Sequence, residues 1–126
     1  MLQPRATAAD PKRAEVIRVG ALEIRPYQGL ALAGGRTLTL SVREFGLLVA
    51  LARREGDIVP RADLYAAVWG RHQRRGDRSI DVHVHKLRSK LDGALPGWHF
   101  IHTHVGFGYR FAPEPSQAVR AVATGG

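Results

Sequence analysis

The chain has 126 residues, of which 44% are hydrophobic, so it can bury one modest core and has no room for a second full domain. Its 19 lysines and arginines against 11 aspartates and glutamates give a formal net charge of +8 at pH 7, which favours an anionic partner, nucleic acid before an anionic membrane. The absence of cysteine excludes disulfides and thiolate zinc sites, and no apolar run approaches the ~20 residues that cross a bilayer.

The two ends of the chain carry few residues that a core could use. Residues 1–13 combine prolines with small and charged residues, which predicts a disordered arm or linker. They lack the apolar centre of a signal peptide, so we expect a cytoplasmic protein. Residues 113–126 are predicted to be a flexible tail, which leaves 14–112 as the folded domain.

Short apolar runs come first in the predicted domain. Glycines and Pro26 divide residues 15–40 into EVIRV, LEI and LAL, each long enough only for a brief strand. We therefore expect a small antiparallel sheet at the amino-terminal end.

From Ser41 the hydrophobic period changes to that of a helix. Ser41 and Glu44 have the spacing of a capping box, and an apolar stripe follows as far as Gly56. A second helix is predicted to begin after Pro60 and to end at Trp69, because proline is favoured at helix starts and glycine follows the tryptophan. Three helices are expected in all, and the third carries most of the functional argument.

The run 78–91, RSIDVHVHKLRSKL, sorts into two opposed faces when it is wound at 3.6 residues per turn. One face is aliphatic and consists of Ile80, Val84, Leu87 and Leu91. The other carries cations and hydrogen-bonding groups and consists of Ser79, Val82, His83, Lys86 and Lys90. Such a polar face suits phosphates and base edges, so we interpret 78–92 as a DNA recognition helix.

The remaining segments complete the predicted architecture. Residues 58–59 are interpreted as a short link and 71–77 as a polar loop, whereas 99–103 and 107–112 flank a glycine-tipped hairpin. The order predicts an α+β fold: a winged helix-turn-helix with an amino-terminal antiparallel sheet, three helices and a carboxy-terminal hairpin as the wing.

Three segments in this order resemble one known family. They are LTLSVREFGLLVALARREGDIVPRADLYAAVWG, RSIDVHVHKLRSKL and IHTHVGFGYRF, and they resemble the winged-helix effector domain of OmpR/PhoB-type response regulators over residues 15–112. The resemblance implies a transcriptional regulator that binds double-stranded DNA sequence-specifically, with helix 78–92 in the major groove and the wing 99–112 near the minor groove. It also implies a domain that is monomeric alone and binds in tandem on direct repeats, with any phosphoacceptor domain outside these residues, removed or naturally absent.

The resemblance further implies individual contacts. Base contacts are expected from Ser79, Val82 and Lys86, whose chemistry suits base edges and the thymine methyl. Phosphate contacts are expected from Trp69, Arg78, His83, His85, Arg88, Thr103 and Tyr109, all of which can donate hydrogen bonds. Arg71, Arg74 and Arg75 form a loop that is either a contact for RNA polymerase, an addition to the phosphate contacts or an ordinary connector.

The wing tip departs from the family pattern. Where family members often have arginine, this chain has Val105, which cannot follow the negative potential of a narrow minor groove. His104 replaces an apolar residue, and His85 stands where a second arginine is common. Because histidine changes charge near neutral pH, a modest pH dependence of affinity is a minor alternative that these two positions leave open.

Competing interpretations rest on the histidines, the charges and the absence of catalytic motifs. His102 and His104 share one side of a strand, but His83 and His85 lie about 200° apart on their helix, so we expect no metal and no cofactor. Asp81 would repel phosphate and is expected to hold a neighbouring arginine instead. Without paired carboxylates, a phosphate-cradling loop or a nucleophile motif, the chain is predicted not to be an enzyme. The alternative is a basic module that binds RNA or lipid nonspecifically.

Overall fold

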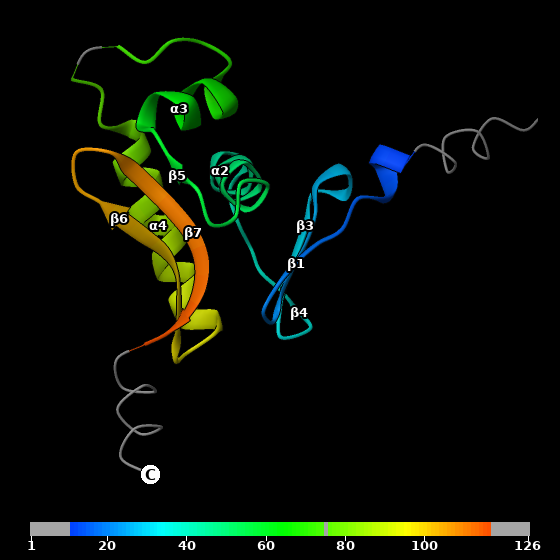
Figure 1. Ribbon diagram of the computed structural model, residues 1–126. Coiled ribbons are helices and arrows are strands. Elements are labelled where there is room, and N and C mark those ends of the chain that lie inside the picture. The colour runs from blue at the N-terminus through cyan, green and yellow to red at the C-terminus, as the bar shows by residue number, and fades with distance from the viewer. Residues whose placement is uncertain (1–10, 75, 117–126) are drawn as a thin grey trace, which may run out of the picture.

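The computed structural model describes residues 11–74 and 76–116 (Figure 1). It begins with a short 3-10 helix, η1 (Pro11–Ala14), followed by a four-stranded antiparallel sheet. The strands are β1 (Ile17–Val19), β2 (Leu22–Arg25), β3 (Leu30–Ala33) and β4 (Arg36–Thr37), with a second 3-10 helix, η2 (Pro26–Gln28), between β2 and β3. The sheet follows chain order, and alternate residues of β2 and β3 are buried. The expected amino-terminal sheet is confirmed.

Three α-helices follow the sheet, as predicted. They are α2 (Val42–Ala52), α3 (Arg61–Trp69) and α4 (Ser79–Ala94). The capping box is formed: the Glu44 N–H donates to the Ser41 hydroxyl, and the Ser41 N–H donates to the Glu44 carboxylate. Helix α2 ends earlier than expected, because residues 53–57 form turns after Ala52. Gly70 closes α3 in the left-handed conformation that glycine accepts most readily.

The wing is a three-stranded sheet that consists of two long strands and one short strand. Strands β6 (Trp98–His104) and β7 (Gly108–Pro115) form the hairpin, and β5 (Ile58–Val59) pairs with the outer edge of β7. The interpretation of residues 58–59 as a plain link was therefore wrong, since Val59 pairs with Tyr109. At Gly108, whose φ is 147°, a Cβ would overlap the Val59 carbonyl oxygen, so β7 lies too close to β5 for any side chain at this position.

The folded part extends slightly beyond the expected boundaries. The 3-10 helix at Pro11–Ala14 lies partly in the predicted arm, and β7 continues three residues past Ala112. Residues 1–10 and 117–126, the rest of the predicted arm and tail, lie outside the described residues.

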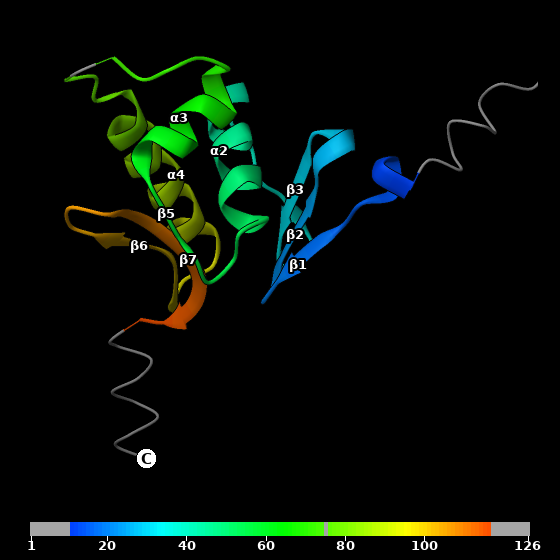
Figure 2. The same ribbon diagram turned by 45° about the horizontal axis from the view of Figure 1, so that its top comes forward.

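One hydrophobic core joins all of these layers. The helices lie between the amino-terminal sheet and the wing (Figures 1 and 2). The predicted inner face of α4 is buried, with Ile80, Val84, Leu87 and Leu91 each at most 1% exposed. Burying one such aliphatic side chain contributes roughly 1.5–3 kcal/mol, so this face fixes the rotation of α4 about its axis. None of the described helices has the length and apolar character that spanning a membrane requires.

An ion pair between a buried carboxylate and an exposed lysine connects α2 to α4. Glu44 is 4% exposed, and the Lys90 ammonium donates to its Oε1 at 2.6 Å. Burial raises the pKa of the Glu44 carboxyl, but the hydrogen bonds from Lys90 and Ser41 outweigh this, so the pKa lies below its ordinary value. Lys90, expected on the outward face of its helix, is therefore turned back to the α2 amino terminus.

Replacing Glu44→Gln tests this pair. Because the pKa of Glu44 is lower in the folded chain, the charged form stabilises the fold above pH 4.5, and that contribution is lost as the pH falls through the folded pKa. The variant should lose about 1–3 kcal/mol of unfolding free energy at pH 7, measured by urea unfolding. The deficit should shrink at pH values below that pKa. Glu55→Gln, an exposed surface change, is the control; an E44Q deficit that does not depend on pH would contradict the assignment.

Candidate nucleic-acid interface

The outward face of α4 is accessible. Val82 is 48% exposed, Lys86 is exposed and Ser79 is half-buried. Their spacing of three and four residues places the three side chains in one row along the helix. The row is thus available to a ligand, as expected, although contact with DNA bases stays a prediction.

The start of α4 is held by the preceding loop. The Ser79 N–H donates to the Asp77 carboxylate at 2.8 Å, and hydrogen bonds from the Ser79 side chain and then from its backbone lower the pKa of Asp77. The Gln73 side chain in turn donates to the Asp77 carbonyl at 3.0 Å. In the loop, Arg71 and Arg74 are exposed, with the Arg71 guanidinium 6.0 Å from the Tyr65 ring centroid. Arg75, the third arginine of the predicted polymerase contact, lies outside the described residues.

An aromatic cluster connects α3 to α4. The Trp69 ring stacks on Tyr65 with 4.7 Å between centroids and meets the His83 ring edge-on at 5.3 Å. The His83 Nδ1 lies 2.8 Å from the Ser79 carbonyl oxygen, which can only accept a hydrogen bond. His83 therefore carries a proton on Nδ1, and its Nε2 is the nitrogen left for other partners.

A third helix contributes a residue to this cluster that sequence reasoning missed. The Arg43 guanidinium lies 4.9 Å from the Trp69 ring centroid, and its Nη1 donates to the Val68 carbonyl at 3.0 Å. No local sequence pattern identifies Arg43 as part of this cluster, because it is an ordinary charged residue in the first turn of α2. Only the packing of α2 against α3 brings it to Trp69.

Two predicted phosphate contacts meet where α4 crosses the wing. The Arg88 Nη2 donates to the Thr103 hydroxyl at 2.8 Å, which joins α4 to β6. The Arg88 Nε is buried and has no hydrogen-bond partner among the described residues. Both side chains therefore lie at one place between helix and wing.

A second junction, around Asp81, joins α3, α4 and the wing. The Asp81 carboxylate accepts from the Arg61 Nε at 2.7 Å and from the Tyr109 hydroxyl, and the Arg78 guanidinium lies 3.9 Å away. Burial raises the pKa of Asp81, but the hydrogen bonds from Tyr109 and Arg61 together lower it by more, so the pKa lies below its ordinary value. The expectation that Asp81 holds an arginine is confirmed.

The predicted phosphate contacts differ in accessibility. Arg78, whose side chain is 82% exposed, and His85 are open to a ligand. Tyr109 fits the prediction poorly, because it is 5% exposed and its hydroxyl proton is donated to Asp81.

The wing tip presents apolar side chains. Val105 is 87% exposed and Phe107 is 72% exposed, the latter unanticipated from the sequence. The His104 Nε2 accepts a hydrogen bond from the Arg110 Nε at 3.1 Å, which connects the two strands of the hairpin. Within residues 11–74 and 76–116, the structure contains no cluster of three potential metal ligands.

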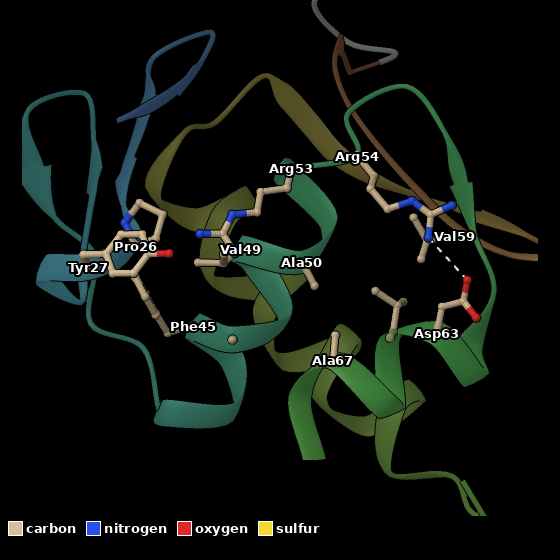
Figure 3. A pocket seen from close by; sticks show the side chains of 12 residues that line it. Pro26, Tyr27, Phe45, Val49, Ala50, Arg53, Arg54, Val59, Asp63 and Ala67 are labelled. Carbon is tan, nitrogen blue, oxygen red and sulfur yellow. Dashed lines mark hydrogen bonds and ion pairs between the residues drawn. The ribbon is translucent and has the colours of Figure 1, made fainter. Parts of the chain in front are cut away.

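A separate open hollow of about 600 Å³ lies between η2, α2, β5 and α3 (Figure 3). Its floor is apolar, with Phe45, Val49 and Ala67, and Arg54 at its rim pairs with Asp63 at 3.3 Å. No residue of α4 lines it, so it is distinct from the face described above.

Comparison with known proteins identifies the family. The profile described as "Transcriptional regulatory protein, C terminal" matches residues 35–111, and the chain belongs to this family. It is 36% identical over 110 residues to the transcriptional activator protein IrlR of Burkholderia pseudomallei, covering 84% of this chain and 48% of the relative. It is 33% identical over 100 residues to the DNA-binding response regulator MtrA of Mycolicibacterium smegmatis, covering 79% and 44%. The chain thus spans about half the length of these curated relatives.

Solved structures agree with the fold. The DNA-binding domain of CpxR from E. coli matches with a TM-score of 0.71 and 35% identity, covering 78% of this chain and 96% of that one. The RstA DNA-binding domain of Klebsiella pneumoniae in complex with the RstA box matches with a TM-score of 0.70 and 34% identity, covering 79% and 99%. The predicted winged-helix fold and the resemblance to OmpR/PhoB-type effector domains are confirmed.

Replacing Asp81→Asn tests the junction between α4 and the wing. Burial and the bond to Asp81 both raise the pKa of Tyr109, so removing the carboxylate charge should lower that pKa part of the way to its ordinary value. An NMR pH titration of the Tyr109 ring measures this. Asp63→Asn, which breaks an exposed pair with Arg54, should leave Tyr109 unchanged. Identical Tyr109 titrations in D81N and the unmodified chain would refute the junction.

Proposed function

We propose that this chain is the DNA-binding domain of a transcriptional regulator that recognises specific sequences in double-stranded DNA. The observation that carries the proposal is the division of α4 into a fully buried face and an accessible face with Ser79, Val82 and Lys86. An α-helix fits the major groove, where base pairs differ in their donors and acceptors. Its relative RstA was solved with the RstA box, which supports the same mode here.

Each residue of the row has a suitable partner on a base edge. The Lys86 ammonium can donate to guanine O6 or N7, and the Val82 methyl groups can contact the thymine methyl. The Ser79 hydroxyl can donate or accept. On this proposal Lys86 carries most of the discrimination, because it brings charge as well as a donor.

Phosphate contacts would set the register of α4 in the groove. Arg78 and His85 are accessible on the helix, while Arg88 and Thr103 meet beside the wing. The net charge of +8 supports a backbone contribution of this kind. These residues should add affinity for every sequence rather than select among sequences.

From the family we also propose how the domain assembles on DNA, which protein it contacts and where it acts. Two copies bind direct repeats in tandem, the isolated domain is monomeric, and the exposed Arg71 and Arg74 belong to a loop that contacts RNA polymerase. The domain acts in the cytoplasm and performs no catalysis of its own.

Lys86→Ala tests the base-reading role. Tight-binding duplexes are first selected from a random library, and dissociation constants are then measured for the selected duplex and for single base-pair variants. Loss of Lys86 should weaken the selected duplex about 5- to 150-fold. The same substitution should have a much smaller effect on binding to the duplex in which the base pair contacted by Lys86 has been changed. Arg36→Ala, an exposed change in β4, should leave the preference intact.

Two outcomes would count against the proposal. If K86A lowered affinity equally for all duplexes, Lys86 would contact phosphate and not bases. If the unmodified chain showed no sequence preference and bound RNA or anionic vesicles equally well, the nonspecific basic module would be the better interpretation.

A further inference from the structure

Arg43 differs from three other arginines on or beside α2 and α3 in having no carboxylate partner among the described residues. Arg53 pairs with Glu15, Arg54 with Asp63 and Arg61 with Asp81. Among the described residues, Arg43 forms no ion pair with a carboxylate and is exposed. Its positive charge is therefore available to an anion from outside.

The Arg43 guanidinium is held in position without being neutralised. One nitrogen donates to the Val68 carbonyl at 3.0 Å, and the group lies 4.9 Å from the Trp69 ring centroid. Arginine has five N–H donors, so the bond to Val68 leaves others free. A positioned guanidinium loses less side-chain entropy on binding than a freely moving one.

The cluster leads directly to the accessible face of α4. Trp69 contacts the edge of His83, and His83 lies between Ser79 and Lys86 along the helix, four residues after the first and three before the second. Figure 2 shows the start of α2 beside α3, at the same end of the molecule as the start of α4. Arg43 thus extends the proposed DNA interface onto a third helix.

Apart from Arg43, the members of this cluster offer few hydrogen-bond donors to a ligand. The His83 Nδ1 proton is donated to the Ser79 carbonyl, so this donor is not available to a ligand. Trp69 offers a single neutral donor in its indole N–H. Arg43 is the member of the cluster that brings a permanent positive charge.

We propose that Arg43, held by Trp69 and the Val68 carbonyl, binds one backbone phosphate of the DNA that α4 reads. This proposal rests on the proposed function and adds a contact from α2 to it. The contact is made to the sugar-phosphate backbone, so it contributes affinity and orientation without sequence preference.

The test measures affinity as a function of salt. Arg43→Gln should bind the selected duplex roughly tenfold more weakly at low salt, because one charge-assisted hydrogen bond is lost. The slope of log affinity against log salt is negative, and its magnitude should fall by about 0.9, the value for one phosphate of duplex DNA. Arg43→Lys should keep the slope, since it keeps the charge.

Arg53→Gln is the matched control, because Arg53 lies one residue beyond the same helix and is exposed but already paired with Glu15. Its salt slope should equal that of the unmodified chain. Urea unfolding of R43Q should match the unmodified chain closely enough that both are fully folded in the binding assay. An R43Q slope equal to the unmodified one would overturn the proposal.

A double-mutant comparison tests the role of Trp69. If Trp69 positions Arg43, the R43Q effect should be smaller in a Trp69→Ala background than in the unmodified chain. Equal effects in both backgrounds would refute the shared site. The two proposals fail separately: absence of sequence preference in the unmodified chain contradicts the proposed function, whereas an unchanged salt slope in R43Q contradicts only the phosphate contact.

Discussion

The burial of one face of α4 is the constraint on which the rest of the structure depends. Ile80, Val84, Leu87 and Leu91 are almost completely removed from solvent, and together they contribute several kcal/mol. A shift of one residue, about 100° around the helix, would bring Asp81 into the core and expose aliphatic surface. Because the inner face is fixed in this way, the opposite face of α4, with Ser79, Val82 and Lys86, is directed outward and no other interaction is needed to orient it.

Two carboxylates on neighbouring helices complete the arrangement that the core begins. Glu44 connects the start of α2 to α4 through Lys90, and Asp81 connects α4 to α3 and the wing through Arg61 and Tyr109. Hydrophobic contacts have little directional preference, whereas hydrogen bonds to a charged group fix both the distance and the angle between the two groups. The core therefore selects the face of α4, and the carboxylates define how α4 is oriented against its neighbours.

Local signals in the sequence predicted most of the fold and which face of α4 is directed outward. The capping box at Ser41, the glycine after α3 and the 3.6-residue period of α4 are properties of adjacent residues, so they can be recognised without tertiary structure. Strand β5 was missed because two residues are too few to display an alternating pattern. The contacts of Lys90 with Glu44 and of Arg43 with Trp69 join residues distant in the chain, and no periodicity reports such pairs.

The close approach of β7 to β5 at Gly108 has a consequence for how the domain would engage a duplex. Since β7 touches the β5 backbone there, the hairpin is fastened to the segment that joins α2 to α3 and cannot swing independently of the helices. The distance between α4 and the tip of the wing is then set by the protein itself. On the proposed function, it is the nucleic acid that must deform to match, and sequences that bend or twist easily would be favoured even at base pairs that no side chain contacts.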